Sequence, residues 1–129
     1  KVIFTGRVPH DAVNAYYSLV DIAPFPRKPY LVCEAVSPIK PFEAMAMEKA
    51  VMASSCDALV EIIDHDNTGL IFEKGNSMDL ADKIETYIND PELRQRLAQN
   101  ARKWIVENKD WKHVSQNITG IYDSFENHG

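Results

Sequence analysis

Short apolar runs alternate along the chain with segments whose apolar residues recur at helical spacing. The runs are bounded by glycine, proline, serine or charged residues, which predicts buried strands, and they cover 2–4, 21–26, 50–53 and 70–72. The helical spacing predicts helices over 12–20, 38–49 and 58–64. Residues 27–37 show no clear period and predict a loop. Strands that alternate with helices indicate βαβ units and therefore a parallel sheet of four strands.

From residue 77 onward the pattern is helical throughout. Ser77 is predicted to cap a helix that carries Leu80, Ile84, Tyr87 and Ile88. Pro91 suits the first position of a second helix, and a third is predicted over 111–125. We therefore expect one α/β unit over 1–129, with a Rossmann-like parallel sheet, flanking helices and a helical tail over about 77–129.

Composition and charge narrow the classes of function. Hydrophobic residues make up 45% of the chain and charged residues 26%, which is typical of a globular protein. The net charge of −5 argues against a nucleic-acid partner, because phosphate backbones are bound by concentrated lysine and arginine. Two cysteines make neither a disulfide framework nor a metal site, and no apolar run is long enough to span a membrane. These features predict a cytoplasmic protein whose cysteines bind no metal.

Two proline-rich loops carry the candidate chemistry. The loop 24–29 places Arg27 and Lys28 directly after a predicted strand. The segment 36–43 opens a predicted helix, where backbone N–H groups and Lys40 would favour an anion and Glu43 would accept bonds from hydroxyls. On this local pattern alone, the alternative is a rigid start to a helix with a solvated lysine.

The order of these segments resembles the C-terminal domain of GT-B glycosyltransferases of glycosyltransferase family 4. The segments that carry the resemblance are 2–8, 21–24, 40–46, 49–54, 61–63, 67–72 and 101–122, with Tyr16 and Tyr17 before the second. No one of these segments is decisive, but they follow one another in the family's order over nearly the whole chain.

The resemblance implies that this chain binds a nucleotide-sugar donor. Residues near the start of the 38–49 helix would hold the diphosphate, and they are Ser37, Pro38, Ile39 and Lys40, with Arg27 in support. Glu43 would bind the ribose hydroxyls, and the base would lie beside Gly6, Arg7 and Val8.

A further glutamate of the family faces the transferred sugar. It stands eight positions before the ribose glutamate, where this sequence has Ala35. Glu34 is adjacent, so we expect it to substitute through a shifted loop. Lys40 and Glu34 are therefore the predicted catalytic residues.

By the same resemblance, the parent protein would transfer a sugar with retention of configuration to a saccharide, lipid or other acceptor, without a metal. The family has two strands and a helix before Val2, and a separate acceptor-binding domain. We therefore expect a partial domain that is inactive alone, with homodimerisation or strand exchange filling the gap in its sheet. Peripheral membrane contact would belong to the full-length protein.

Two other functions remain open on the sequence. One is a non-catalytic interaction module with a glycosyltransferase-like shape, which Ala35 favours. The other is a different GT-B enzyme, such as a nucleotide-sugar epimerase, that would use the same donor pocket.

Overall fold

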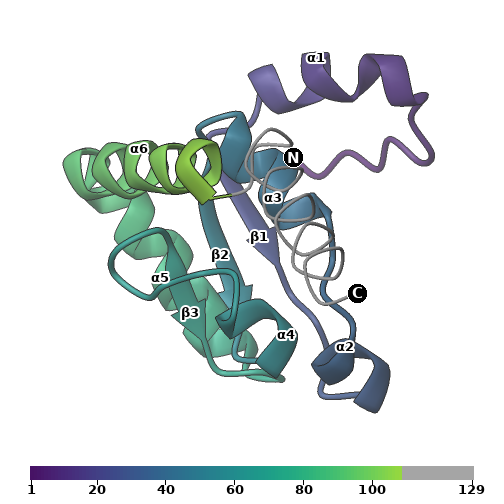
Figure 1. The fold of residues 1–129 in the computed structure, drawn as a ribbon, viewed down its shortest axis with the longest axis vertical. Coiled ribbons are helices and arrows are strands. Elements are labelled where there is room, and N and C mark those ends of the chain that lie inside the picture. The colour runs from purple at the N-terminus through teal and green to yellow at the C-terminus, as the bar shows by residue number, and fades with distance from the viewer. Residues whose placement is uncertain (109–129) are drawn as a thin grey trace, which may run out of the picture.

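The computed structural model describes residues 1–108 and has an α/β architecture in which helices flank a parallel sheet (Figure 1). Its elements in chain order are η1 (His10–Ala12), α1 (Val13–Ser18), β1 (Ile22–Phe25), α2 (Leu31–Ala35), α3 (Lys40–Ala46), β2 (Ala50–Ser54), α4 (Asp57–Val60), β3 (Leu70–Phe72), α5 (Ser77–Asn89) and α6 (Pro91–Asn108). The predicted fold class is confirmed. The helix predicted over 111–125 lies outside the described residues.

The sheet of the described residues has three strands in the order β1-β2-β3. Both pairings are parallel, with Ala23 opposite Val51 and Met52 opposite Leu70. The middle strand β2 is buried at every position, which explains why its sequence is a continuous apolar run. Pro24 lies in β1, at the edge of this sheet, where a residue without a backbone N–H is tolerated.

The prediction of a strand over 2–4 is wrong. Val2, Ile3 and Phe4 are 79%, 71% and 94% exposed and pair with no strand of the described residues. An apolar run forms a strand only where a neighbouring strand supplies its backbone hydrogen-bond partners, and the sheet of the described residues consists of β1, β2 and β3 alone. Strand exchange between copies stays a prediction.

The loop predicted over 27–37 contains the five-residue helix α2. Residues 31–35 carry no helical signal because α2 buries no residue, so no apolar stripe marks its inner face. The helix α3 is shorter than the predicted 38–49, since Glu48 takes up a φ of 55° and ends it. The helix α4 also ends earlier than predicted, at Val60.

The two faces of β2 pack against separate apolar clusters. Val51 and Ala53 face a cluster built with α3, α4 and α6, whereas Ala50 and Met52 face one built with β3, α5 and α6. Because α6 contributes to both clusters, it joins the two layers. This packing fixes the sheet that carries the loops described below.

Polar contacts secure α5 against this sheet. The buried Tyr87 hydroxyl donates to the Val51 carbonyl at 2.9 Å, and burial raises the pKa of Tyr87 above its ordinary value. The N-cap of α5 is Asn76 and not Ser77 as predicted, because the Asn76 side chain accepts from the amides of Met78 and Asp79. Pro91 opens α6 as predicted.

A close backbone contact also requires one glycine. A Cβ atom at Gly69 would lie 2.7 Å from the Val51 carbonyl oxygen, so only glycine lets β3 approach β2 here. Within residues 1–108, no helix combines the length and the apolar composition needed to cross a membrane.

Candidate functional site

A cavity of about 630 Å³ opens between the N-terminal segment, α1 and the first turns of α3. Six of the residues predicted to bind a donor line it: Gly6, Arg7, Val8, Ile39, Lys40 and Glu43. These residues come from two parts of the chain more than 30 positions apart, so the fold itself brings them together. The remaining wall is formed largely by η1 and α1.

Helix α3 sets the relation between Lys40 and Glu43. The two residues are three positions apart, so their side chains lie on one side of the helix. Lys40 is exposed and Glu43 is half-buried. Gly6 has a φ of 68°, a conformation that glycine adopts without strain, and it turns the N-terminal segment at the cavity wall.

Tyr17 of α1 is a site residue that was not predicted to bind ligand. Its hydroxyl donates to the Lys40 carbonyl at 3.4 Å. Burial, followed by the nearby charge of Glu43, raises the pKa of Tyr17. Its position as the fifth of the six residues of α1 gave no sign that it would contact the start of α3.

The chemistry of this cavity is mixed. Arg7 and Lys40 supply positive charge, and Glu43 supplies an acceptor for hydroxyl groups. Tyr16 and Tyr17 contribute aromatic surface that suits a planar ring. Such a cavity can hold a ligand that combines an anion, hydroxyls and an aromatic group.

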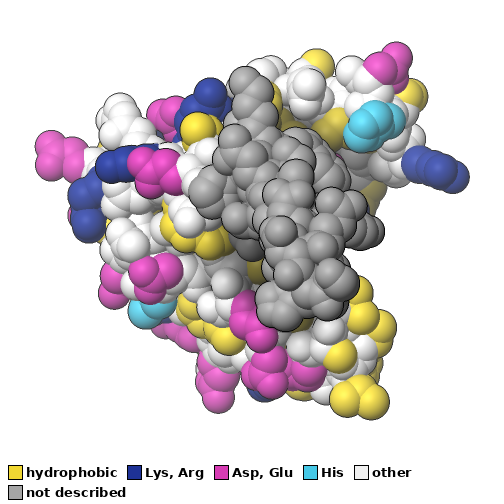
Figure 2. Space-filling model, viewed as in Figure 1, with side chains coloured by type: hydrophobic (Ala, Val, Ile, Leu, Met, Phe, Trp, Pro, Cys, Tyr) yellow, Lys and Arg dark blue, Asp and Glu magenta, His cyan; other side chains and the backbone are white. Residues whose placement is uncertain are grey.

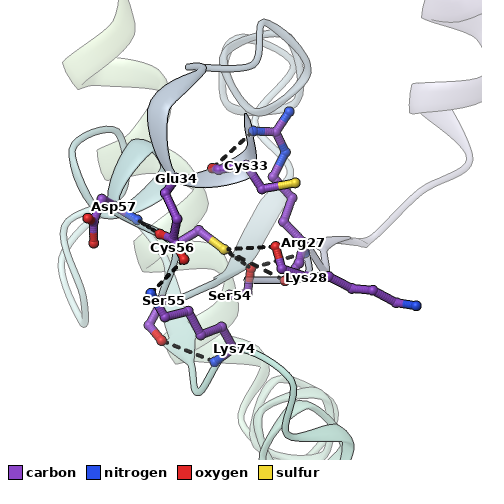
Figure 3. Close-up of polar contacts among 9 residues, drawn as sticks. All are labelled: Arg27, Lys28, Cys33, Glu34, Ser54, Ser55, Cys56, Asp57 and Lys74. Atoms are coloured by element: carbon purple, nitrogen blue, oxygen red, sulfur yellow. Dashed lines mark hydrogen bonds and ion pairs between the residues drawn. The ribbon is translucent and has the colours of Figure 1, made fainter. Parts of the chain in front are cut away.

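A second polar cluster lies where the three strands end at their carboxyl edge (Figure 3). Arg27, after β1, donates its backbone N–H to Ser54 Oγ at 3.0 Å. Its guanidinium donates to the carbonyls of Val36 at 2.7 Å and Cys33 at 3.4 Å. Arg27 therefore holds α2 in place, and its predicted contact with a diphosphate stays a prediction.

The thiol of Cys56 adds to this cluster. Cys56 is fully buried, and its Sγ lies 3.7 Å from each of the carbonyl oxygens of Arg27 and Lys28. It thereby joins the loop after β1 to the start of α4.

Glu34 of α2 is held by two donors from different loops. Lys74 Nζ donates to its Oε1 at 2.6 Å, and the Asp57 amide donates to its Oε2 at 2.8 Å. The hydrogen bond from Lys74, followed by that from Asp57, lowers the pKa of Glu34 below its ordinary value. Sequence reasoning missed Lys74, which lies 40 positions from Glu34; its place two residues after a predicted strand was the available signal.

Ser37 and Pro38 lie in the connection from α2 to α3 and do not line the cavity. They lie along the chain between Glu34 at the strand ends and Lys40 at the cavity. The predicted site residues are thus divided between two places joined by one short connection.

Hydrophobic side chains gather over α2, at the lower right of Figure 2. The exposed ones there include Tyr30, Leu31 and Val32.

Comparison with known sequences gives a consistent result. The model of the family described as "Glycosyl transferases group 1" matches residues 1–104. An uncharacterized glycosyltransferase of Methanocaldococcus jannaschii is 29% identical over 95% of this chain and 30% of its own length. The alpha-D-kanosaminyltransferase of Streptomyces kanamyceticus is 25% identical over the same shares. The chain thus spans about 30% of the length of these curated relatives.

Solved structures agree on the architecture. A C-terminal domain of a glycosyl transferase group 1 family protein from Francisella tularensis matches with a TM-score of 0.67 and 26% identity, over 84% of this chain and 53% of that one. Sucrose-phosphate synthase from Thermosynechococcus elongatus has a TM-score of 0.81 at 22% identity, over 98% of this chain and 31% of that one. HepE from Anabaena, crystallised with UDP-glucose, has a TM-score of 0.75 at 23% identity, over 84% of this chain and 29% of that one. The fold resembles that of the C-terminal domain from Francisella tularensis.

Proposed function

The chain belongs to the group 1 glycosyltransferase family, and from that premise we propose that it binds the nucleotide-sugar donor of a retaining glycosyltransferase. The observation that carries this proposal is the cavity of about 630 Å³, which gathers six predicted donor-binding residues from two distant parts of the chain. Its volume falls in the range of about 300–1,000 Å³ that is usual for small-molecule sites.

Each part of a nucleotide diphosphate has a matching group in this proposal. The base lies beside Gly6, Arg7 and Val8, and the ribose hydroxyls donate to Glu43. Lys40 pairs with the diphosphate, assisted by the backbone N–H groups of Ser37 and Ile39 in the connection before it. The crystal structure of HepE with UDP-glucose supports this class of ligand, since HepE shares the fold.

In the whole protein, we propose that the sugar is transferred to a saccharide, lipid or other acceptor bound by another domain. Lys40 stabilises the negative charge that develops on the departing diphosphate, which is electrostatic catalysis and requires no metal. The free thiols of Cys33 and Cys56 suit the reducing cytoplasm, where we place this reaction. Peripheral membrane contact through the remaining domain stays part of the proposal.

Calorimetric titration of the chain with UDP, GDP and their glucose and mannose derivatives tests this function. We expect saturable binding of one nucleotide class, weakened about 10-fold or more by Lys40→Ala and by Glu43→Ala, because each removes a charged partner of the ligand. Lys83→Ala, on α5 and outside the cavity, is the matched control and should bind normally. Equal affinity in all three variants would contradict the site assignment.

One observation favours the alternative of a non-catalytic module. Both oxygens of Glu34 already accept a hydrogen bond from within the protein, which would suit a purely structural carboxylate. A module of that kind would show no saturable binding of any nucleotide in the same titration. An epimerase would also bind the donor, and a search for the epimerised sugar nucleotide among the products separates it from a transferase.

A further inference from the structure

One carboxylate connects the loops that follow all three strands. Glu34 lies on α2, in the connection after β1. Its Oε2 accepts from the Asp57 amide, which follows β2, and its Oε1 accepts from Lys74, which follows β3. Figure 3 shows these groups converging at the carboxyl ends of the strands, which is where ligands bind in open α/β sheets.

Lys74 is fixed at both of its ends. Its backbone N–H donates to Ser55 Oγ at 3.1 Å, while its Nζ lies 2.6 Å from Glu34 Oε1. The side chains of Lys74 and Glu34 are 34% and 20% exposed, so the pair is partly withdrawn from water and more firmly held than a fully exposed pair. The hydrogen bond from Glu34 raises the pKa of Lys74, and that from Lys74 lowers the pKa of Glu34, so both groups are charged at neutral pH.

The carboxylate retains acceptor capacity after these two contacts. Each carboxylate oxygen carries two lone pairs, and Lys74 and Asp57 each occupy one of these four on Glu34. The Cys56 thiol is a further, weaker donor to Glu34, so at least one lone pair stays open for a hydroxyl of a bound sugar. The internal donors hold the carboxylate in one orientation, so a ligand does not bear the entropic cost of ordering it.

We propose that Lys74 is a positioning residue that sets Glu34 for the sugar of the donor and thereby contributes to the preference for a sugar nucleotide over the free nucleoside diphosphate. This inference rests on the proposed function and adds to it a residue outside the predicted site. The ligand group concerned is the hydroxyl-rich pyranose, whereas the nucleotide lies in the cavity beside Lys40 and Glu43.

Arg27, the other cation of this cluster that makes side-chain bonds to α2, does not bind the Glu34 carboxylate. The Arg27 guanidinium donates to the carbonyls of Cys33 and Val36, so it secures the backbone of α2 and leaves the carboxylate to Lys74. Loss of Lys74 should therefore leave α2 in place and free only the carboxylate. This separation makes a selective effect on the sugar the distinguishing result.

The test is the ratio of two affinities measured by calorimetry on the 129-residue chain. The ligands are UDP against UDP-glucose and GDP against GDP-mannose, and the pair that the unaltered chain binds is used for the variants. We expect Lys74→Ala to weaken the sugar nucleotide about 10-fold while the free diphosphate changes less than about 2-fold. Lys74→Arg, which keeps the charge and a donor, should restore most of the loss, and Lys103→Ala, which breaks the exposed pair with Glu107, should change neither.

Each other outcome overturns the inference. An equal loss for both ligands would show a general structural role, and unchanged affinities would show that the pair is irrelevant to the sugar. Thermal unfolding of each variant establishes that it is folded, and Lys74→Arg gives the answer if Lys74→Ala does not fold. If the unaltered chain binds none of the nucleotides, the proposed function fails together with this inference, whereas a failure at Lys74 alone leaves the donor cavity standing.

Discussion

The segment before α3 and the segment that begins with α3 differ sharply in how they are packed. In residues 1–39, η1, α1 and α2 contain no buried residue. In residues 40–108, β2 is buried throughout, and α5 and α6 bury Tyr87, Leu97, Ala98 and Ala101. We call residues 1–39 the site segment and residues 40–108 the scaffold. The comparison shows that much of the candidate site rests on the thinly packed part of the molecule.

This division has a physical basis. Burial of apolar surface supplies most of the favourable free energy of folding, so the scaffold supplies most of the stability. A ligand needs exposed groups with unsatisfied bonding capacity, and these lie in the site segment and at the first turn of α3. Substitutions in the two parts should therefore have opposite consequences, which the following experiments examine on matched residues.

The largest effect on stability is expected at Leu97 in the scaffold. Leu97 is fully buried between α6 and the sheet, so Leu97→Ala removes apolar contacts and leaves a cavity. We expect the free energy of unfolding to fall by about 2–5 kcal/mol. Urea denaturation followed by circular dichroism measures the change, and a loss below about 1 kcal/mol would break the comparison.

An intermediate effect is expected at Tyr87. Tyr87→Phe keeps the ring in the core but removes the donor to the Val51 carbonyl, leaving that buried oxygen without this partner. The expected loss is about 1–2 kcal/mol of unfolding free energy, smaller than for Leu97→Ala because no large cavity forms. The same denaturation experiment detects it, with nucleotide affinity of the folded fraction unchanged.

The smallest effect is expected at Leu31 in the site segment. Leu31 is 84% exposed on α2, so Leu31→Ala should change the unfolding free energy by less than about 0.5 kcal/mol. The pair Leu97→Ala and Leu31→Ala makes the same chemical change in the two segments and is the sharpest form of the comparison. A cost at Leu31 equal to that at Leu97 would mean that another surface covers α2.

The sequence was most informative where burial is greatest. The strands over 50–53 and 70–72 were predicted because β2 and β3 are uninterrupted apolar runs enclosed by packing. Helix α2 was missed because it buries nothing, and residues 2–4 were wrongly predicted because an apolar run does not reveal whether a partner strand is adjacent. Local pattern reports burial well and long-range pairing poorly.

The candidate site was predictable to a similar, limited extent. The residues that line the cavity were indicated by resemblance to a family. Their spacing alone was equally compatible with the rigid start of a helix and a solvated lysine. The ion pair of Glu34 with Lys74 joins positions 40 residues apart, and no short-range pattern specifies such a contact. Only the converging strand ends bring the two together.

The short length of α2 has a consequence for how this region opens. A helix of five residues is far below the length that persists in water, so its order is supplied mainly by the two bonds from the guanidinium of Arg27. Breaking those few contacts releases α2 while the sheet stays intact, which is sub-global unfolding. Amide hydrogens of α2 should therefore exchange with deuterated solvent well before those of β2, and the region around Glu34 can rearrange without endangering the fold.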